Sequence, residues 1–198
     1  MTVRAPREDT ARLPRSFRLT IIRHGQTAAN LDGKFCGTSD LSLTSIGRKM
    51  AQLLPTNPHI LSVKRIVSSP LLRARETADA MVSALGLEPL ETDFRLRELE
   101  FGQWEGMLPS EVDGTEAYRR WSEDPYHNAP PDGETGHTVL KRTLNAVGEA
   151  LFHTQNLAVV THKTPARLLA AFLARHNLSG FRSMSGFAVS SVTVIQVV

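Results

Sequence analysis

Cysteine is almost absent from this 198-residue sequence, which contains only Cys36. A single cysteine excludes an internal disulfide and any metal site built from several cysteines. It also fits a reducing compartment, so we expect a cytoplasmic protein. A cysteine phosphatase would need a Cys-x5-Arg motif, but Ser42 stands where the arginine is required. We therefore interpret Cys36 as a packing residue.

Long apolar runs are missing as well. No stretch approaches the roughly 20 apolar residues of a membrane span, and the N-terminal segment lacks the apolar centre of a secretory signal. We expect residues 1–16 to form a mobile polar tail and residues 17–198 to form a single domain with a sizeable core. The chain also lacks a Gly-x4-Gly-Lys-[Ser/Thr] loop, which excludes a nucleotide kinase or ATPase of that type.

Neither sign of charge is in large excess. Lys and Arg number 23 against 20 Asp and Glu, a net charge of +3, which is too small to indicate a nucleic-acid partner. Only five of the basic residues are lysines, so arginine supplies most of the positive charge. The planar guanidinium suits carboxylate or phosphate, although we interpret most of these arginines as surface residues.

Four short runs rich in valine and isoleucine predict strands, and their nearly continuous apolar character favours strands covered on both faces. These runs are 17–22, 63–67, 157–161 and 189–197. Helical patterns lie between them, at 43–54, 69–86, 138–154 and 164–177. This alternation predicts an α/β fold, a three-layer α/β/α sandwich with a mostly parallel central sheet.

Local signals place the ends of these helices. Thr44 is predicted to cap the first helix, while Ser69 and Pro70 open the second and Gly86 ends it. Segment 101–136 is richer in Pro, Gly, Trp and charge, and we expect a helical excursion and a long loop there. No internal repeat or low-complexity block is present.

Three of the predicted strands end in polar residues. The first ends in Arg23 and His24, the second leads into a helix with Arg73 near its start, and the third ends at His162 before another helix. In open α/β sheets, ligands bind beyond the carboxyl ends of the strands, where helix N-termini offer free N–H groups. We predict that these groups meet at one site suited to a dianionic phosphate.

Several sequence motifs follow one another along the chain, over about residues 18–198. They are RHGQTAAN at 23–30, GTSDLSLTSIGRKMA at 37–51, SSPLLRARETA at 68–78, LRELEFGQWEGM at 96–107, PPDGET at 130–135 and VVTHKTPARLL at 159–169. In this order they resemble the signature segments of the histidine phosphatase superfamily, the phosphoglycerate mutase-like proteins. The resemblance implies the phosphoglycerate mutase-like fold.

The resemblance also implies a role for each matching residue, and implies neither a metal nor a cofactor. His24 would be the nucleophile that becomes phosphohistidine, and Glu98 the general acid and then the general base. The phosphate would be surrounded by Arg23, Asn30, Arg73 and His162. A neutral imidazole suits attack on a dianionic phosphoryl group, and the two arginines with a protonated His162 would stabilise the charge that develops during transfer.

Three further residues are candidates for the substrate pocket: Lys163, Thr164 and Trp104. Family members usually have glycine or another small residue where this chain has Lys163, and its ammonium group would add a charge able to bind a second acidic feature of the substrate. Trp104 and Trp121 either line the mouth of the site or are core aromatics, and the core is favoured.

One alternative site lies in the loop 127–137. It places His127, Asp132, Glu134 and His137 close together in sequence. Because no strict ligand spacing is met, a polar loop is favoured over a metal site.

The function that the resemblance implies is hydrolysis of a small-molecule phosphate monoester, without nucleic acid or membrane as a partner. At this length the compact phosphatases, such as α-ribazole phosphatase and broad-specificity members, match better than the mutases, which are typically longer. A cofactor-dependent phosphoglycerate mutase and a non-catalytic phosphate-ester binding protein remain as alternatives. A homodimer is left open.

Overall fold

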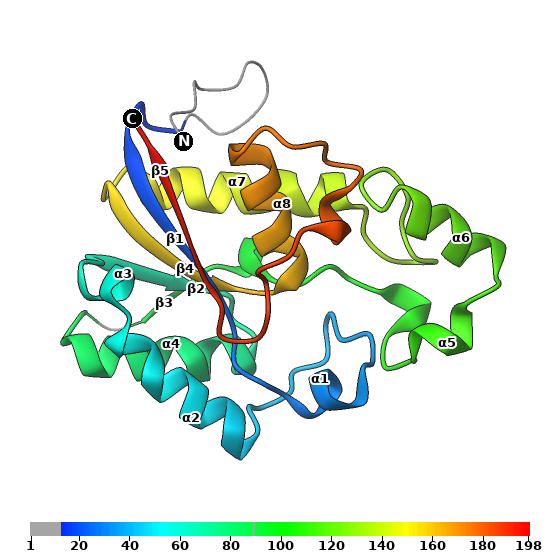
Figure 1. Ribbon diagram of the computed structural model, residues 1–198, viewed down its shortest axis with the longest axis horizontal. Helices are drawn as coiled ribbons and strands as arrows, with labels where there is room; N and C mark the ends of the chain where they lie inside the picture. The colour runs from blue at the N-terminus through cyan, green and yellow to red at the C-terminus, as the bar shows by residue number, and fades with distance from the viewer. Residues whose placement is uncertain (1–12, 89) are drawn as a thin grey trace.

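The computed structural model describes residues 13–88 and 90–198, so most of the predicted tail 1–16 lies outside the described residues. Five strands form one sheet in the order β3-β2-β4-β1-β5. Their bounds are β1 Phe17–Arg23, β2 Arg65–Ser68, β3 Glu91–Thr92, β4 Asn156–Thr161 and β5 Val192–Val197. All pair in parallel except β5, which runs antiparallel to β1. The predicted α/β fold with a mostly parallel sheet is confirmed (Figure 1).

Helices cover both faces of this sheet (Figure 1). Those that pack on it are α4 Leu72–Leu85, α7 Gly136–Leu151 and α8 Lys163–Leu173, while α2 Ser45–Leu53 packs against α4. Side chains of β4 alternate between the two faces. Leu157 and Val159 belong to the core beneath α7 and α8, whereas Ala158 and Val160 belong to the core beneath α4. This two-sided burial explains why the strands read as continuous apolar runs.

The predicted helix ends are correct in two places and wrong in one. The Thr44 hydroxyl accepts a hydrogen bond from the Gly47 amide at 3.0 Å and so caps α2, and Gly86 ends α4 in the left-handed conformation. The start of α4 at Ser69 and Pro70 is wrong, because the helix begins at Leu72. The Ser69 amide still donates to the Val160 carbonyl at 2.9 Å, which keeps the chain extended beyond β2.

Shorter elements complete the fold. They are α1 Ala28–Asp32, α3 Pro58–Leu61, α5 Pro109–Val112, α6 Glu116–Glu123 and the 3-10 helices η1 Leu54–Thr56, η2 Phe94–Leu96, η3 Gly102–Trp104 and η4 Phe181–Ser183. The predicted excursion over 101–136 corresponds to η3, α5 and α6, and Figure 1 shows α5 and α6 at a distance from the sheet. β3 was not predicted, because two exposed residues carry no periodic signal. Within the described part of the chain, every helix is too short or too polar to span a bilayer.

We predict that Gly47→Ala destabilises the protein. Alanine inside a helix normally stabilises by about 0.5–1 kcal/mol relative to glycine. Here a Cβ atom on Gly47 would lie 2.2 Å from the Gln26 carbonyl oxygen, on the loop that follows His24. We therefore expect the free energy of unfolding to fall by about 1–3 kcal/mol, measured by urea titration.

The matched control is Gly180→Ala, where the nearest atom to the new Cβ is 3.8 Å away. We expect this control to unfold at nearly the same urea concentration as the wild type. A stabilised Gly47→Ala protein would show that the contact between α2 and the loop of Gln26 is not tight.

Candidate active site

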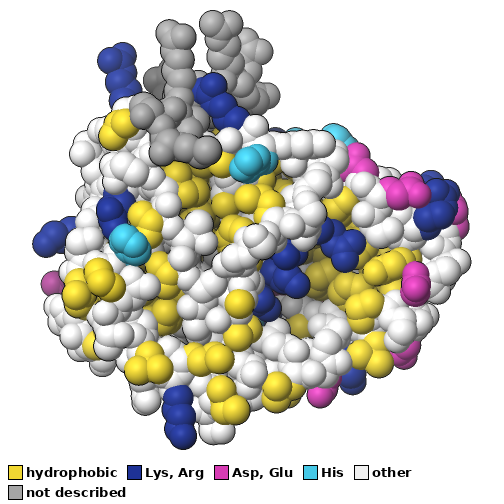
Figure 2. Space-filling view, in the orientation of Figure 1, with side chains coloured by type: hydrophobic (Ala, Val, Ile, Leu, Met, Phe, Trp, Pro, Cys, Tyr) yellow, Lys and Arg dark blue, Asp and Glu magenta, His cyan; other side chains and the backbone are white. Residues whose placement is uncertain are grey.

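A pocket of about 790 Å³ lies at the carboxyl ends of β1 and β4. It brings together seven of the nine predicted site residues: Arg23, His24, Asn30, Arg73, Glu98, Lys163 and Thr164. His162 and Trp104 are not among its lining residues. Figure 2 shows a hollow in this face of the molecule, with Lys and Arg side chains on one side of it and hydrophobic side chains on the other. The predicted convergence of strand ends on one site therefore holds for most of the residues that were proposed.

His24 directly follows β1 and is buried in the floor of the pocket. Its Nδ1 atom lies 2.7 Å from the Gly25 carbonyl oxygen, which can only accept, so Nδ1 carries the proton and Nε2 keeps a free lone pair. Burial lowers the pKa of His24 well below its ordinary value of 6.5, and the charges of Arg73 and Arg23 lower it further. The ring is therefore a neutral imidazole with an available nitrogen.

Arg73 is almost completely buried, with 1% of its surface exposed. Its guanidinium donates to the carbonyl oxygens of Ser39 at 2.6 Å and Gly37 at 2.9 Å, and its Nε donates to Nδ1 of His162 at 3.2 Å. The same loop is held from its other side by the carboxylate of Glu105, which accepts from the amides of Gly37 and Ser39. This arginine thus joins α4, the loop before α2 and the end of β4.

His162 lies behind Arg73 rather than on the pocket surface, and its ring centroid is 5.0 Å from that of His24. Because Nδ1 accepts from Arg73, the proton sits on Nε2, which donates to the Ser69 hydroxyl at 2.8 Å. Burial, followed by the charge of Arg73, lowers the pKa of His162 well below 6.5. The ring is therefore neutral in the absence of a ligand, and a protonated His162 during phosphoryl transfer stays a prediction.

Glu98 is buried at the edge of the pocket, next to the start of α8. Its Oε1 atom accepts from the amides of Leu99 at 2.8 Å and Thr164 at 3.2 Å. Oε2 has only a 3.4 Å contact with the Thr164 amide. Oε2 is therefore the oxygen that is free to exchange a proton with a ligand.

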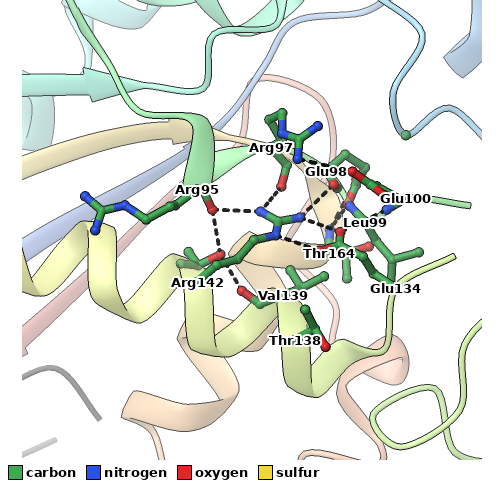
Figure 3. Close-up of polar contacts among 12 residues, drawn as sticks. Arg95, Arg97, Glu98, Leu99, Glu100, Glu134, Thr138, Val139, Arg142 and Thr164 are labelled. Atoms are coloured by element: carbon green, nitrogen blue, oxygen red, sulfur yellow. Dashed lines mark hydrogen bonds and ion pairs between the residues drawn. The ribbon is translucent and has the colours of Figure 1, made fainter.

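Arg142 on α7 fixes the backbone that carries Glu98 (Figure 3). Its Nη1 donates to the carbonyl oxygens of Arg95 and Arg97, both at 2.7 Å, and its Nη2 donates to that of Glu98 at 2.8 Å. Glu134 forms an ion pair with the same guanidinium at 2.8 Å. Arg142 was not predicted as a functional residue, although its partner Glu134 belongs to the PPDGET motif.

The two helix starts differ from the expectation of free N–H groups. The Leu72 amide at the start of α4 donates to the Asp40 carboxylate, and the Thr164 amide at the start of α8 donates to Glu98. Both carboxylates lie where a helix dipole stabilises negative charge. These two amides are therefore occupied by side chains of the chain itself.

Asn30 lines the pocket from α1. Its Oδ1 atom accepts from the amide of Thr27 at 3.0 Å and from its hydroxyl at 3.1 Å. Only the Nδ2 group of this side chain is therefore left to donate to a ligand.

Trp104 is a core residue and not part of the pocket. It is buried among aromatic rings, with its centroid 5.3 Å from that of Trp121, and Trp121 is the tryptophan that lines the pocket. Trp104 lies in η3, whereas Trp121 lies in α6. The contacts of Trp104 therefore support its interpretation as a core aromatic.

The polar residues of loop 127–137 take separate partners. His127 bonds Asp124 at 2.7 Å, Asp132 accepts from Gln103 at 2.9 Å, and Glu134 pairs with Arg142. Over residues 13–88 and 90–198, no group of three or more His, Cys, Asp or Glu is arranged to hold a metal ion.

The pocket also contains cations that the sequence analysis did not name. Arg167 on α8, Arg182 on η4 and Lys34 line it together with the predicted Lys163. Arg167 could have been found from its spacing, because it follows Lys163 by one helical turn. Arg182 lies in an irregular segment, where no periodic signal connects it to α8.

We predict that stability decreases in mild acid because of the two buried histidines. Their pKa values in the folded protein are depressed, so below about pH 6.5 the unfolded chain binds protons that the folded protein does not. The free energy of unfolding should therefore fall as the pH drops below about 6.5, by up to about 1.4 kcal/mol per pH unit for each ring.

Urea titrations at several pH values measure this slope, and His162→Gln should make it shallower. His153→Gln is the control, because it removes an imidazole from the surface. An unchanged slope in His162→Gln would contradict the assignment of a neutral buried ring.

Comparisons with known proteins agree with this geometry. The sequence is 34% identical over 161 residues to an adenosylcobalamin/alpha-ribazole phosphatase of Escherichia coli, which covers 79% of either chain. It is 33% identical over 170 residues to phosphoserine phosphatase 1 of Hydrogenobacter thermophilus, covering 84% of this chain and 80% of the relative. A mycobacterial glucosyl-3-phosphoglycerate phosphatase in complex with VO3 superposes with a TM-score of 0.81 at 28% identity, covering 90% of either chain. Residues 19–197 match the sequence profile of the histidine phosphatase superfamily (branch 1), and the chain therefore belongs to that superfamily.

Proposed function

We propose that this protein is a phosphatase that hydrolyses small-molecule phosphate monoesters through a phosphohistidine at His24. The observation that carries the proposal is the state of His24, a neutral imidazole with its Nε2 lone pair free beside two arginines. The relatives point the same way, because they are named as phosphatases of alpha-ribazole, phosphoserine and glucosyl-3-phosphoglycerate.

In the first step, Nε2 of His24 attacks the phosphorus atom and the bond from phosphorus to the ester oxygen breaks. The bonding electrons go to the departing oxygen, which takes a proton from Oε2 of Glu98. The hydrogen bond from Nδ1–H to the Gly25 carbonyl holds the ring in the reactive tautomer and stabilises the positive charge that it acquires.

The charge that develops on the transferred phosphoryl oxygens is stabilised by cations already in position. Arg23 lies in the pocket with its Nη1 bonded to the Phe187 carbonyl at 2.8 Å, and Arg73 is held by its carbonyl partners. Because these groups are fixed before substrate arrives, little reorganisation is needed during transfer.

In the second step, the Glu98 carboxylate takes a proton from water, and the resulting hydroxide attacks the phosphohistidine. The phosphorus–nitrogen bond breaks, its electrons return to Nε2 of His24, and inorganic phosphate leaves. Glu98 ends this step protonated, as it began the first, so the cycle is closed. Arg142 acts on both steps through the position of the Glu98 backbone.

We predict that brief exposure to a phosphate ester, followed by quenching, leaves phosphate on the protein that is labile in acid and stable in base. The reason is a phosphoramidate bond at Nε2 of His24. Mass spectrometry after alkaline digestion should find the modification on the peptide that contains His24, and His24→Ala should carry none. Equal labelling of that variant would contradict the proposal, and rapid interconversion of 2- and 3-phosphoglycerate without phosphate release would indicate the mutase alternative.

We predict that Glu98→Gln slows alkyl phosphates far more than p-nitrophenyl phosphate. An alkoxide needs a proton to leave, whereas nitrophenolate leaves without one, and general acid catalysis contributes about 10²–10⁴-fold. The measurement is kcat for both kinds of ester. Equal slowing of the two would exclude Glu98 as the acid.

We predict that Arg142→Lys also slows alkyl phosphates more than p-nitrophenyl phosphate, but by a smaller factor than Glu98→Gln. An ammonium group cannot reach the carbonyl oxygens of Arg95, Arg97 and Glu98 in the planar geometry of the guanidinium. Glu98 is then misplaced, which costs up to about 10²-fold for alkyl esters and less for p-nitrophenyl phosphate. Arg119→Lys, on the surface of α6, is the matched control and should leave both rates unchanged.

A further inference from the structure

We propose that Lys163, Arg167 and Arg182 form a second anion-binding subsite, which takes a carboxylate or a second phosphate carried by the leaving group of the substrate. This inference rests on the proposed function, because it concerns the part of the ester beyond the transferred phosphoryl group. It narrows the substrate class to phosphate monoesters with a second anionic group.

The three cations come from two elements that contact each other. Lys163 and Arg167 lie one turn apart on α8, so they project from the same face of the helix. Arg182 lies on η4, which packs against α8. All three line the pocket. Lys163 is exposed at its mouth, whereas Arg167 and Arg182 are half-buried.

These cations have no counter-ions of their own. Across residues 13–88 and 90–198, no carboxylate lies within ion-pair distance of any of the three, and the Nε atom of Arg167 is buried without a hydrogen-bond partner. Arg95, Arg119 and Arg142 each pair with a carboxylate. These three arginines outside the pocket are thus neutralised, whereas Arg167 and Arg182 are not.

The pocket as a whole also has more positive than negative side chains. Its charged lining consists of six cations and one carboxylate: Arg23, Lys34, Arg73, Lys163, Arg167, Arg182 and Glu98. Glu98 already accepts hydrogen bonds from two amides. One phosphoryl dianion at His24 would leave most of this positive charge uncompensated.

The subsite cations act on one another more than on the reacting histidine. Burial lowers the pKa of Arg167, and repulsion from Arg182 lowers it further. Burial also lowers the pKa of Lys163, and the nearby charge of Arg167 adds to the effect. The charges that lower the pKa of His24 are instead those of Arg73 and Arg23. Burial lowers the pKa of Arg23, and the charge of Arg167 lowers it further, ahead of that of Arg73. The cations along α8 and η4 therefore adjoin those around His24 in the same pocket.

The geometry of Arg182 favours a fixed planar anion site. Its guanidinium carbon lies 4.2 Å from the centroid of the Trp121 ring, so one face of the cation is stacked on the pocket wall. A stacked guanidinium keeps its in-plane N–H groups free, and those groups match a carboxylate or phosphate. An anion there would relieve the repulsion among the three cations and satisfy Arg167.

The test compares pairs of esters that differ only by the second anion. 3-Phosphoglycerate is compared with glycerol 3-phosphate, and fructose 1,6-bisphosphate with fructose 6-phosphate. The first pair tests a carboxylate and the second pair tests a second phosphate. Affinities are measured by calorimetry on the His24→Ala protein, so that no ester is turned over, and kcat/KM is measured on the protein with His24 intact.

We expect the doubly anionic member of at least one pair to bind about 10–100-fold more tightly, since hydrogen bonds to charged groups are among the strong ones. Arg167→Gln and Arg182→Gln, each added to His24→Ala, should reduce that preference by about tenfold. The matched control is Arg75→Gln, an exposed arginine of α4 outside the pocket, which should keep the preference. Raised salt should weaken the preference as well.

Equal affinity for both members of both pairs would overturn the subsite, as would a preference that survives Arg167→Gln and Arg182→Gln. Urea titration of each variant establishes that it is folded. Failure of the proposed function is a different result: the protein with His24 intact would release no phosphate from any ester, whatever the binding preference of His24→Ala.

Discussion

The buried guanidinium of Arg73 is the group on which the geometry of the site depends. Its donors reach the carbonyl oxygens of Gly37 and Ser39 and the ring of His162, while its own carbonyl accepts from Thr77, whose hydroxyl in turn accepts from the Gly25 amide. A buried cation without partners would cost several kcal/mol. The segments that supply those partners must therefore all be in place together, and assembling them also sets the environment of His24.

Arginine serves two separate purposes in this molecule. Arg142 is neutralised by Glu134 and surrounded by carbonyl oxygens, so it holds the backbone near Glu98 in place. Arg167 and Arg182 line a cavity without carboxylate partners among the described residues, so their charge remains available. The difference lies in what surrounds each guanidinium, because the side chain itself is the same. The number of arginines in the sequence therefore does not show which of them hold the backbone and which are available to a ligand.

Local patterns were sufficient to predict the α/β fold and the meeting of Arg23, His24 and Arg73 at one site, whereas Asn30 and Glu98 were added by the resemblance to the superfamily. Valine-rich runs mark strands covered on both faces, and their polar ends place Arg23, His24 and Arg73 at one edge of the sheet. What could not be predicted depends on contacts between distant segments. The neutral state of His162 follows from its burial and from the charge of Arg73, which is 89 residues away in the sequence. The late start of α4 likewise follows from pairing between Ser69 and Val160.

The position of β1 in the sheet has a consequence for how the chain folds during synthesis. β1 is made early, yet both of its neighbours, β4 and β5, come from residues 156–197. Closing such long loops costs entropy before any contact is gained, which makes sheets of this kind slow to form. His24, at the end of β1, therefore remains without its surroundings for most of translation. A ribosome must produce nearly the whole domain before the reacting group can be ordered, and until then the apolar side chains of β1 are exposed to aggregation.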